Sequence, residues 1–310
     1  MHGHGHRLTA TLDALAAALT DHLDGARAGD LVGVHQARVA SRRLREALPL
    51  AVGAAGVAAV RRARRAVRGL TRALGPVREM DVALGLLDDL QAAHAHLSDP
   101  LDATRRVVTD ERAARRDAMA TALGPEQEVA ALEAVAAVRD GLVARDRPWR
   151  GVLARRVTAR GRELSAAIDH AGILYNPDAL HAIRITAKKL RYGLELGIEL
   201  RVARAALAVR TLRRMQDLLG ELHDYQVLSR FAAEAAFRGT PILLKGEQQL
   251  VVLLQRKCLR IHAQYLRLRA GLVGVAEEAP GRFATQARAR PARRPRRRAR
   301  ARARAARSGE

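Results

Sequence analysis

Two stretches of the sequence place a histidine and three cations on one side of a predicted helix. In the first, His35, Arg38, Arg42 and Arg45 are spaced three, four and three residues apart, so they share one helix face over three turns. Like charges at these spacings repel one another, and no acid lies among them. An anion lying along each stripe would explain the pattern. The second stripe, 146 residues later, consists of His181, Arg184, Lys188 and Arg191.

The stripes belong to a long-period repeat. Residues 34–48 match residues 180–194, and further on residues 74–79 match residues 219–224 with an offset of 145. Two separated blocks in the same order indicate a duplicated helical unit. Each histidine opens its stripe near a predicted helix N-terminus, where backbone N–H groups also favour anions. We expect a bound polyanion to raise the pKa of both histidines.

The helix after each stripe adds further cations. Two antiparallel helices with facing basic stripes would make a groove with cationic walls, so we expect a basic groove built from the two halves. In the first half these cations are Arg61, Arg65, Arg68 and Arg72, and in the second half they are Arg210, Arg213 and Arg214.

The charge of the chain points to a polyanionic partner. The 310 residues carry +23, of which residues 282–310, with twelve Arg and one Glu, supply +11. The rest of the chain is therefore basic without this tail. Such a charge attracts nucleic acid, polyphosphate or anionic lipid. A coding bias explains the use of Arg in place of Lys but not the net excess.

Periodicity and composition predict an all-α fold. Aromatic residues make up only 3% of the chain and much of its apolar content is alanine, which favours closely packed helices over sheets. Residues 279–310, rich in Arg, Ala and Pro, should be disordered. Helices are expected from Leu8 onward and at about 32–48, 57–74, 77–97, 101–147 in two pieces, 149–171, 179–200, 201–219, 221–237 and 243–275.

Several function classes find no support in the sequence. It has no Walker loop, no zinc-type Cys and His spacing and no nucleophile elbow, so we expect no enzyme activity, no cofactor and no metal. Cys258 is the single cysteine, which fits a reducing cytoplasm. No apolar run approaches the roughly 20 residues that span a bilayer. We therefore expect a soluble, cytoplasmic protein without membrane insertion.

The repeated motifs resemble those of the CHAD family, the conserved-histidine α-helical domain. One hallmark is His-x-x-Arg-hydrophobic-x-x-[Lys/Arg]-[Lys/Arg]-Leu-Arg, found at residues 35–45 and 181–191. The other is Leu-Gly-x-x-[Arg/Asn/His]-Asp, found at 74–79, with Glu79 in place of Asp, and at 219–224. The resemblance covers about residues 8–275. It predicts one domain over residues 8–278, with repeat halves of about 8–145 and 146–278, followed by the tail at 279–310.

The resemblance implies two pseudo-symmetric four-helix bundles around a central basic groove that binds inorganic polyphosphate. It also implies association with polyphosphate granules and with proteins bound there. The preference for polyphosphate over nucleic acid comes chiefly from the resemblance. The predicted contacts to polyphosphate are His35, Arg38, Arg42, Arg43, Arg45, Arg65, Arg68, Arg72, Arg78, His181, Arg184, Lys188, Lys189, Arg191, Arg210, Arg213, Arg214 and His223.

The sequence leaves two alternatives open. The main rival function is nonspecific nucleic-acid binding through the basic body and the tail, in which residues 293–298 would hold phosphates with a steep salt dependence. Such binding would associate the protein with the nucleoid. For Glu79, Asp81 and Asp224, one interpretation is that they stand behind the basic side chains and orient them. The other is that each carboxylate lies near a helix N-terminus and interacts favourably with the helix dipole.

Overall fold

The described part of the chain folds into helices and short 3-10 turns, with no strand among those residues. The computed structural model describes residues 4–145, 149–239, 245–279 and 281. The prediction of an all-α fold is confirmed, whereas nearly all of the predicted disordered tail lies outside the described residues. The elements are α1 (His4–Arg27), α2 (Leu31–Ala47), η1 (Leu48–Ala51), α3 (Val52–Ala55), α4 (Val57–Ala93), η2 (Ala95–Leu97), α5 (Ser98–Ala122), α6 (Pro125–Ala144), α7 (Arg150–Ala171), α8 (Pro177–Glu199), α9 (Ala206–Gly239) and α10 (Lys245–Glu278).

Both stripe helices begin at a side chain that caps them. Helix α2 follows Asp30, whose carboxylate accepts a hydrogen bond from the backbone N–H of Gly33 at 2.6 Å. Helix α8 follows Asn176, whose side-chain oxygen accepts from two backbone N–H groups of the first turn, each at 3.1 Å. Such caps satisfy N–H groups that have no partner inside the helix. They fix where each stripe starts, because each stripe histidine lies five residues after its cap.

Helix α4 is longer than the sequence indicates. The predicted break at Gly75 and Pro76 is wrong, since α4 continues through Pro76. A proline inside a helix removes one backbone hydrogen bond and costs about 3 kcal/mol. Here the residues around the proline are held by packing, because Leu74, Val77 and Met80 are fully buried. Burial of this helix in the core therefore outweighs the local preference to stop.

Helix α9 is likewise continuous where two helices were predicted, and it starts later than expected. Residues 201–205 form the turn that ends α8. Arg201 adopts a left-handed conformation with φ of 56°, and the N–H of Val202 donates to the carbonyl of Gly197 at 2.8 Å. This is the hydrogen bond of a Schellman-type helix end. Because the left-handed position is occupied by an arginine and not by a glycine, the turn could not be predicted from the sequence.

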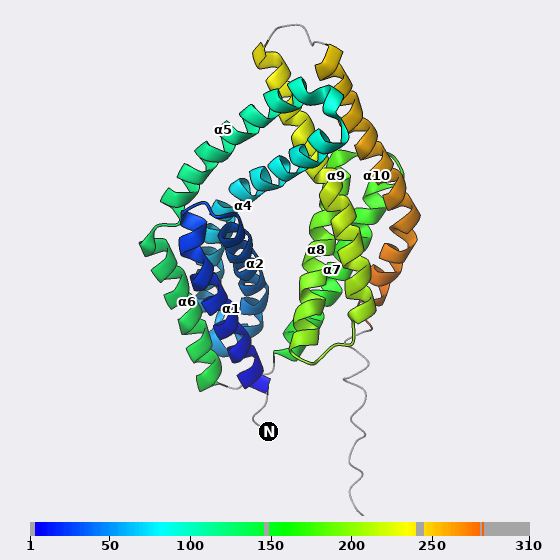
Figure 1. Ribbon diagram of the computed structural model, residues 1–310. Helices are drawn as coiled ribbons and strands as arrows, with labels where there is room; N and C mark the ends of the chain where they lie inside the picture. Colours follow the sequence, from blue (N-terminus) through cyan, green and yellow to red (C-terminus); the bar gives the residue numbers. More distant parts are fainter. Residues whose placement is uncertain (1–3, 146–148, 240–244, 280, 282–310) are drawn as a thin grey trace, which may run out of the picture.

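The helices assemble into two bundles that meet at an apex (Figure 1). In the first bundle α1, α2, α4 and α6 pack in a ring, and in the second bundle α7, α8, α9 and α10 do the same. The upper parts of α4 and α9 extend beyond their bundles and meet α5 and α10. The two bundles also touch directly, through α2 and α8. A pseudo-twofold relation between the halves, and their division at residues 145 and 146, stay predictions.

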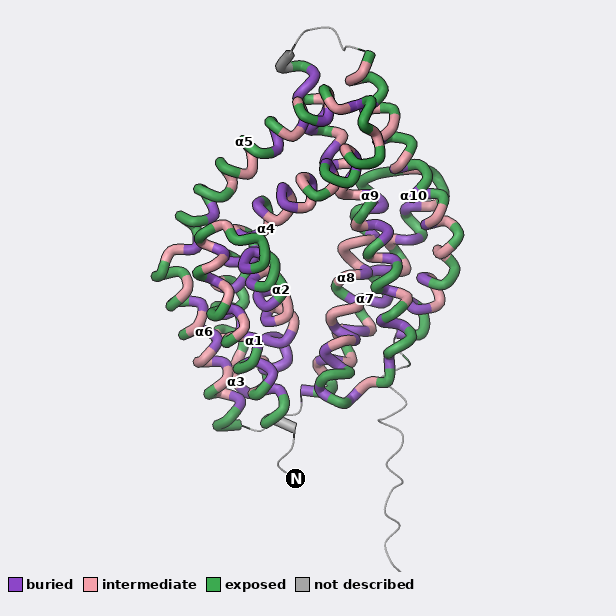
Figure 2. Tube along the Cα trace, viewed as in Figure 1, coloured by how far each residue is buried: buried purple, intermediate pink, exposed green. Residues whose placement is uncertain are grey.

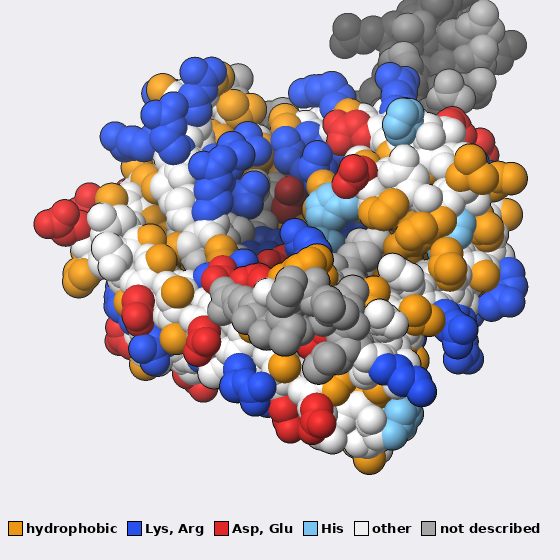
Figure 3. All heavy atoms as spheres, turned by 90° about the horizontal axis from the view of Figure 1, so that it is seen from above, with side chains coloured by type: hydrophobic (Ala, Val, Ile, Leu, Met, Phe, Trp, Pro, Cys, Tyr) orange, Lys and Arg blue, Asp and Glu red, His pale blue; other side chains and the backbone are white. Residues whose placement is uncertain are grey.

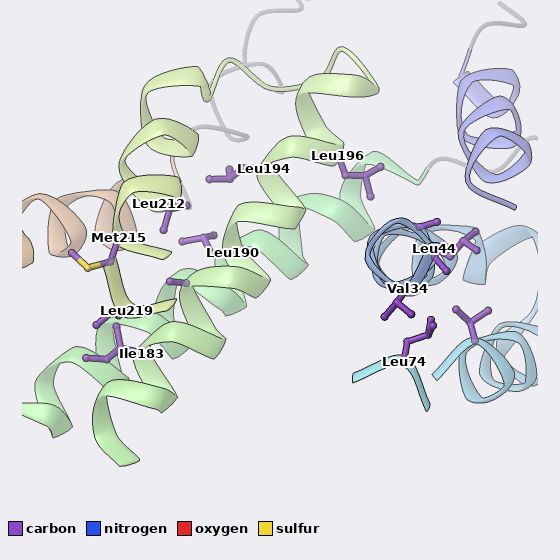
Figure 4. Packing of buried hydrophobic residues seen from close by; sticks show 14 of the residues in the cluster. Val34, Leu44, Leu74, Ile183, Leu190, Leu194, Leu196, Leu212, Met215 and Leu219 are labelled. Atoms are coloured by element: carbon purple, nitrogen blue, oxygen red, sulfur yellow. The ribbon is translucent and has the colours of Figure 1, made fainter. Parts of the chain in front are cut away.

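The apolar core runs through both bundles (Figures 2 and 4). Leu44 and Leu74 represent it in the first bundle, and Leu190 and Met215 in the second; all four are at most 1% exposed. The apolar face of α2, formed by Ala37, Ala40, Leu44 and Ala47, is buried, and so are Leu8, Leu12, Leu15 and Leu19 of α1. The stripe side chains therefore lie on the face of each helix that the core leaves free. No described helix has the length and apolar character required to cross a membrane.

Candidate functional site

The stripes of α2 and α8 come together between the two bundles. We call Arg38, Arg42, Arg184, Lys188 and Arg191 the central basic cluster. Tyr192 lies between the stripes: the guanidinium carbon of Arg191 is 4.7 Å from its ring centroid and that of Arg42 is 5.9 Å away. Seen from above, the molecule is hollowed near its middle, with basic and histidine side chains along the walls (Figure 3).

The cations of this cluster affect one another strongly. Burial, together with the charges of Arg42, Arg184, Arg38 and Arg191, lowers the pKa of Lys188 to about 6. Burial and the charge of Arg42 also lower the pKa of Arg38 to about 10. Within the described residues, none of Arg38, Arg42, Arg184 and Lys188 has a carboxylate within 4.0 Å. These four side chains therefore hold positive charge without a close ion pair in a partly desolvated place, and the largest balancing effect on Arg184 is the charge of Asp224.

Arg38 is positioned by the neighbouring helix α4. Its Nη1 donates to the carbonyl oxygen of Thr71 at 3.3 Å, and the hydroxyl of Thr71 donates to that of Ser41 at 3.1 Å. Gly75 lets the guanidinium come this close, because a Cβ on that residue would lie 2.8 Å from Arg38 Nη1. In the second half nothing lies within 4 Å of the equivalent position on Gly220.

The stripe histidines lie at the edge of the cluster. The rings of His181 and His223 are 5.0 Å apart. Burial lowers the pKa of His181, and the charges of His223 and Arg184 lower it further. Burial also lowers the pKa of His35, helped by Arg78 and Arg38. Without an anion, both stripe histidines therefore favour the neutral ring near pH 7.

Glu79 connects the two halves at this edge. Its Oε1 lies 3.7 Å from Nε2 of His223, and its Oε2 accepts from Nη1 of Arg115 at 2.9 Å. His223 and Arg115 lower the pKa of Glu79 to about 2, against the effect of burial. The geometry agrees with the interpretation that Glu79 orients a histidine and an arginine.

The other two predicted carboxylates behave differently. Asp81 is buried and accepts from Nε of Arg112 at 2.8 Å, and Arg112 also donates to the carbonyl of Gly29 at 3.0 Å. It therefore ties α4 to α5 and to the turn before α2, and it orients none of the predicted phosphate contacts. Burial raises the pKa of Asp224, while the charge of Arg184 lowers it.

Several predicted contacts lie outside the cluster. Arg43 pairs with Glu199 across the bundles, and Lys189 lies 3.8 Å from Glu163. Arg213 pairs with Glu195 at 2.8 Å, and so does Arg191 at 2.9 Å. The acid-free stretch of the second stripe therefore ends at Arg191, because Glu195 follows one helical turn later. The remaining predicted cations on the long helices are exposed: Arg65, Arg68, Arg72, Arg210 and Arg214.

Three residues that contribute to this region were missed by reasoning from sequence. Arg64 of α4 lies beside Arg45 and helps to lower its pKa, after burial and Arg68. Its helical spacing from Arg61 and Arg68 could have revealed it. Arg156 of α7 reaches the first bundle and lies 3.3 Å from Glu46, and nothing in the local sequence signals this contact. Tyr192 was visible only as the residue after the second stripe.

A cavity of roughly 700 Å³ lies beside the cluster, against α8, α9 and α10. It shares His181 and His223 with the edge of the cluster, but Tyr175, Cys258 and Leu259 give it largely apolar walls. In the part of the chain that the structure describes, no group of three or more His, Cys, Asp or Glu residues is placed to hold a metal ion.

Comparison with known proteins decides the family. A family model described as the CHAD domain matches residues 10–233. The chain belongs to the CHAD family. Its fold is similar to that in the crystal structure of the CHAD domain from the plant Ricinus communis, with a TM-score of 0.60 and 22% sequence identity. That similarity covers 89% of this chain and 91% of the plant domain. No curated protein sequence matches the chain.

Proposed function

We propose that this CHAD protein is a non-catalytic binder of inorganic polyphosphate and that the central basic cluster holds the chain. One observation carries the proposal: cations from both halves converge in a partly buried place. Among the described residues Arg38, Arg42, Arg184 and Lys188 have no carboxylate within 4.0 Å, and burial together with the charges of neighbouring arginines lowers the pKa of Lys188 to about 6. A polyphosphate chain would supply negative charge along its length. Its oxygens also suit the forked guanidinium groups of Arg38, Arg42 and Arg184.

The shape of the region favours a thin polyanion over a nucleic-acid duplex. Cα atoms of α2 and α8 approach within 8 Å of each other, so these helices pack directly against each other where they meet. A polyanion would therefore lie along the cluster beside this contact, where a single chain of phosphates needs far less space than a duplex. The guanidinium groups of Arg42 and Arg191 lie over the ring of Tyr192, where they compete with the stacking of a base.

Nonspecific nucleic-acid binding is the second candidate, and the observation in its favour is the charge of residues 282–310. These residues would hold DNA or RNA phosphates by charge alone, with an affinity that falls steeply with salt. They leave the central cluster free for polyphosphate. Association with polyphosphate granules, with proteins bound there or with the nucleoid follows as a further part of the proposal.

Competition between the two polyanions tests the proposal. Long-chain polyphosphate would be bound first to the full chain and to a chain ending at Gly281, and duplex DNA of equal phosphate concentration would then be added. We expect both proteins to bind polyphosphate and the shorter protein to retain it in the presence of DNA. Equal displacement by DNA from the shorter protein would refute a site specific for polyphosphate. Release of orthophosphate by the purified protein would refute the non-catalytic role.

A further inference from the structure

A second group of arginines surrounds an open pocket of roughly 540 Å³ at one end of the first bundle. We call it the arginine pocket. Four of its arginines come from the start of α4, one from the end of the first stripe and one from α7 of the other bundle. Val52, Val60 and Val152 contribute apolar lining between these cations. The six are Arg45, Arg61, Arg64, Arg65, Arg68 and Arg156.

Almost none of this charge is balanced. Arg156 lies 3.3 Å from Glu46, a carboxylate that also binds Arg160. In the described part of the chain the other five arginines have no carboxylate within 4.0 Å. An open concave surface with apolar walls and one sign of charge concentrates the electrostatic potential. Guanidinium groups in such a place suit bidentate contacts to phosphate oxygens.

The sequence repeat supplies matching positions in the second half, but fewer of them are arginines. At an offset of 145, Ala206 and Val209 stand where the first half has Arg61 and Arg64. Three of the arginines recur, as Arg191, Arg210 and Arg213. Arg191 and Arg213 both pair with Glu195, whereas Arg210 is exposed. At these matched positions the first half therefore carries more unpaired positive charge than the second half.

Arg45 joins the arginine pocket to the central basic cluster. It is the last residue of the first stripe. Burial lowers its pKa and Glu46 raises it, while the charges of Arg68 and Arg64 from the pocket and of Arg42 from the cluster lower it further. We propose that the arginine pocket is an additional phosphate-binding site, an inference that rests on the proposed function. A polyphosphate chain held in the central cluster continues into this pocket, so binding extends toward the first bundle and not symmetrically toward both.

The test removes three exposed arginines of the pocket from the full chain: Arg64→Gln, Arg65→Gln and Arg68→Gln. The control removes three exposed arginines of α10: Arg256→Gln, Arg260→Gln and Arg267→Gln. Both variants lose the same charge, and circular dichroism checks that each is folded. Binding is measured with tripolyphosphate and with polyphosphate fractions of increasing length, at several salt concentrations.

We expect the pocket variant to bind long chains about tenfold more weakly than the control. The slope of log affinity against log salt concentration should become shallower by roughly one for each phosphate that the variant no longer neutralises. The difference should grow with chain length, since a longer chain reaches further into the pocket. Removal of three arginines from the corresponding part of α9, by Arg210→Gln, Arg213→Gln and Arg214→Gln, should weaken binding less than the changes in α4. Equal effects of the α4 and α10 changes at every length would overturn the inference.

A third variant, Arg38→Gln with Lys188→Gln, separates this inference from the proposed function. If that variant loses binding of long chains while the pocket variant matches the α10 control, only the additional site is wrong. If all variants bind alike, the proposed function is wrong as well.

Discussion

Lys188 has the most strongly lowered pKa in the central basic cluster. Its pKa of about 6, against an ordinary 10.5, arises from burial and four neighbouring arginines. Between these two values the unfolded chain binds a proton that the folded chain does not. The free energy of unfolding of the unliganded protein therefore rises with pH across this window. The reason is that the proton bound only by the unfolded chain stabilises that chain less as the pH increases.

Substitution of Lys188 by methionine should remove this cost. We expect Lys188→Met to raise the free energy of unfolding at pH 7 by about 1 kcal/mol or more and to flatten its dependence on pH between 7 and 9. Urea denaturation at several pH values measures both effects. The neighbouring Lys189→Met, at an exposed lysine, serves as control and should change little. A loss of stability in Lys188→Met at pH 7 would contradict the assigned environment.

Binding of polyphosphate should reverse the depressed pKa values of the site. Negative charge next to Lys188, His35 and His181 favours their protonated forms, so the complex takes up protons that the free protein lacks near pH 7. Affinity should therefore increase as the pH falls from 8 to 6. Calorimetry in two buffers of different ionisation enthalpy measures the proton uptake directly. Release of protons, or an affinity independent of pH, would contradict this prediction.

Gly75 and Gly220, the glycines of the repeated motifs at 74–79 and 219–224, provide a matched pair of substitutions. Alanine in a helix is more stable than glycine by about 0.5–1 kcal/mol, and Gly220→Ala should show this gain with polyphosphate binding unchanged, since its Cβ meets open space. Gly75→Ala should gain less and bind about threefold more weakly or worse, because the new Cβ displaces the guanidinium of Arg38. Thermal unfolding and polyphosphate titration compare them. Identical behaviour of the two variants would rule out this role of Gly75.

At the scale of helices, the long elements α4 and α9 each connect a bundle to the apex. Two ion pairs join α4 to α5 with different burial. The carboxylate of Asp81 is buried and binds Arg112 at 2.8 Å, whereas Asp88 is exposed and lies 2.8 Å from Arg105. A buried carboxylate cannot exchange its partner for water, so these two contacts should differ in their effect on stability.

Neutral substitutions separate the two contacts. We expect Asp81→Asn to lower the free energy of unfolding by about 1–3 kcal/mol, because Arg112 loses its charged partner inside the structure. Asp88→Asn should cost less than about 1 kcal/mol. Guanidinium chloride should not be used here, since its ions screen charge; urea denaturation gives the comparison. A larger loss for Asp88→Asn would show that the anchor of α5 has been misassigned.

The helices themselves were largely predictable, and their lengths were not. The helices expected from Leu8 onward and at about 32–48 correspond to α1 and α2, because a helix repeats its apolar residues every three to four positions and that period is readable in the sequence. The breaks predicted at Pro76 and Gly220 were wrong, because α4 and α9 continue through these residues. Whether a helix continues past a weak position depends on what it packs against, and that information lies in distant parts of the chain.

At the scale of the whole molecule, the sequence indicated two basic stripes but not which cations stay unpaired. Spacing placed Arg43 and Arg213 beside the others, yet Glu199 and Glu195 bind them. Arg156 reaches the arginine pocket from the other bundle, and no local pattern reports such a contact. Pairing across bundles thus decides which basic residues remain for an anion, and it turns a symmetric sequence pattern into an asymmetric distribution of charge.

The most direct measurement compares two variants of the full chain from which equal charge has been removed. One carries Arg38→Gln, Arg42→Gln, Arg184→Gln and Lys188→Gln in the central cluster. The other carries Arg106→Gln, Arg256→Gln, Arg260→Gln and Arg267→Gln on exposed helix surfaces. Affinity for long-chain polyphosphate at physiological salt should fall about a hundredfold or more in the first and less than about threefold in the second. Equal losses of affinity would contradict a central binding site, because binding would then depend on net charge and not on the central basic cluster.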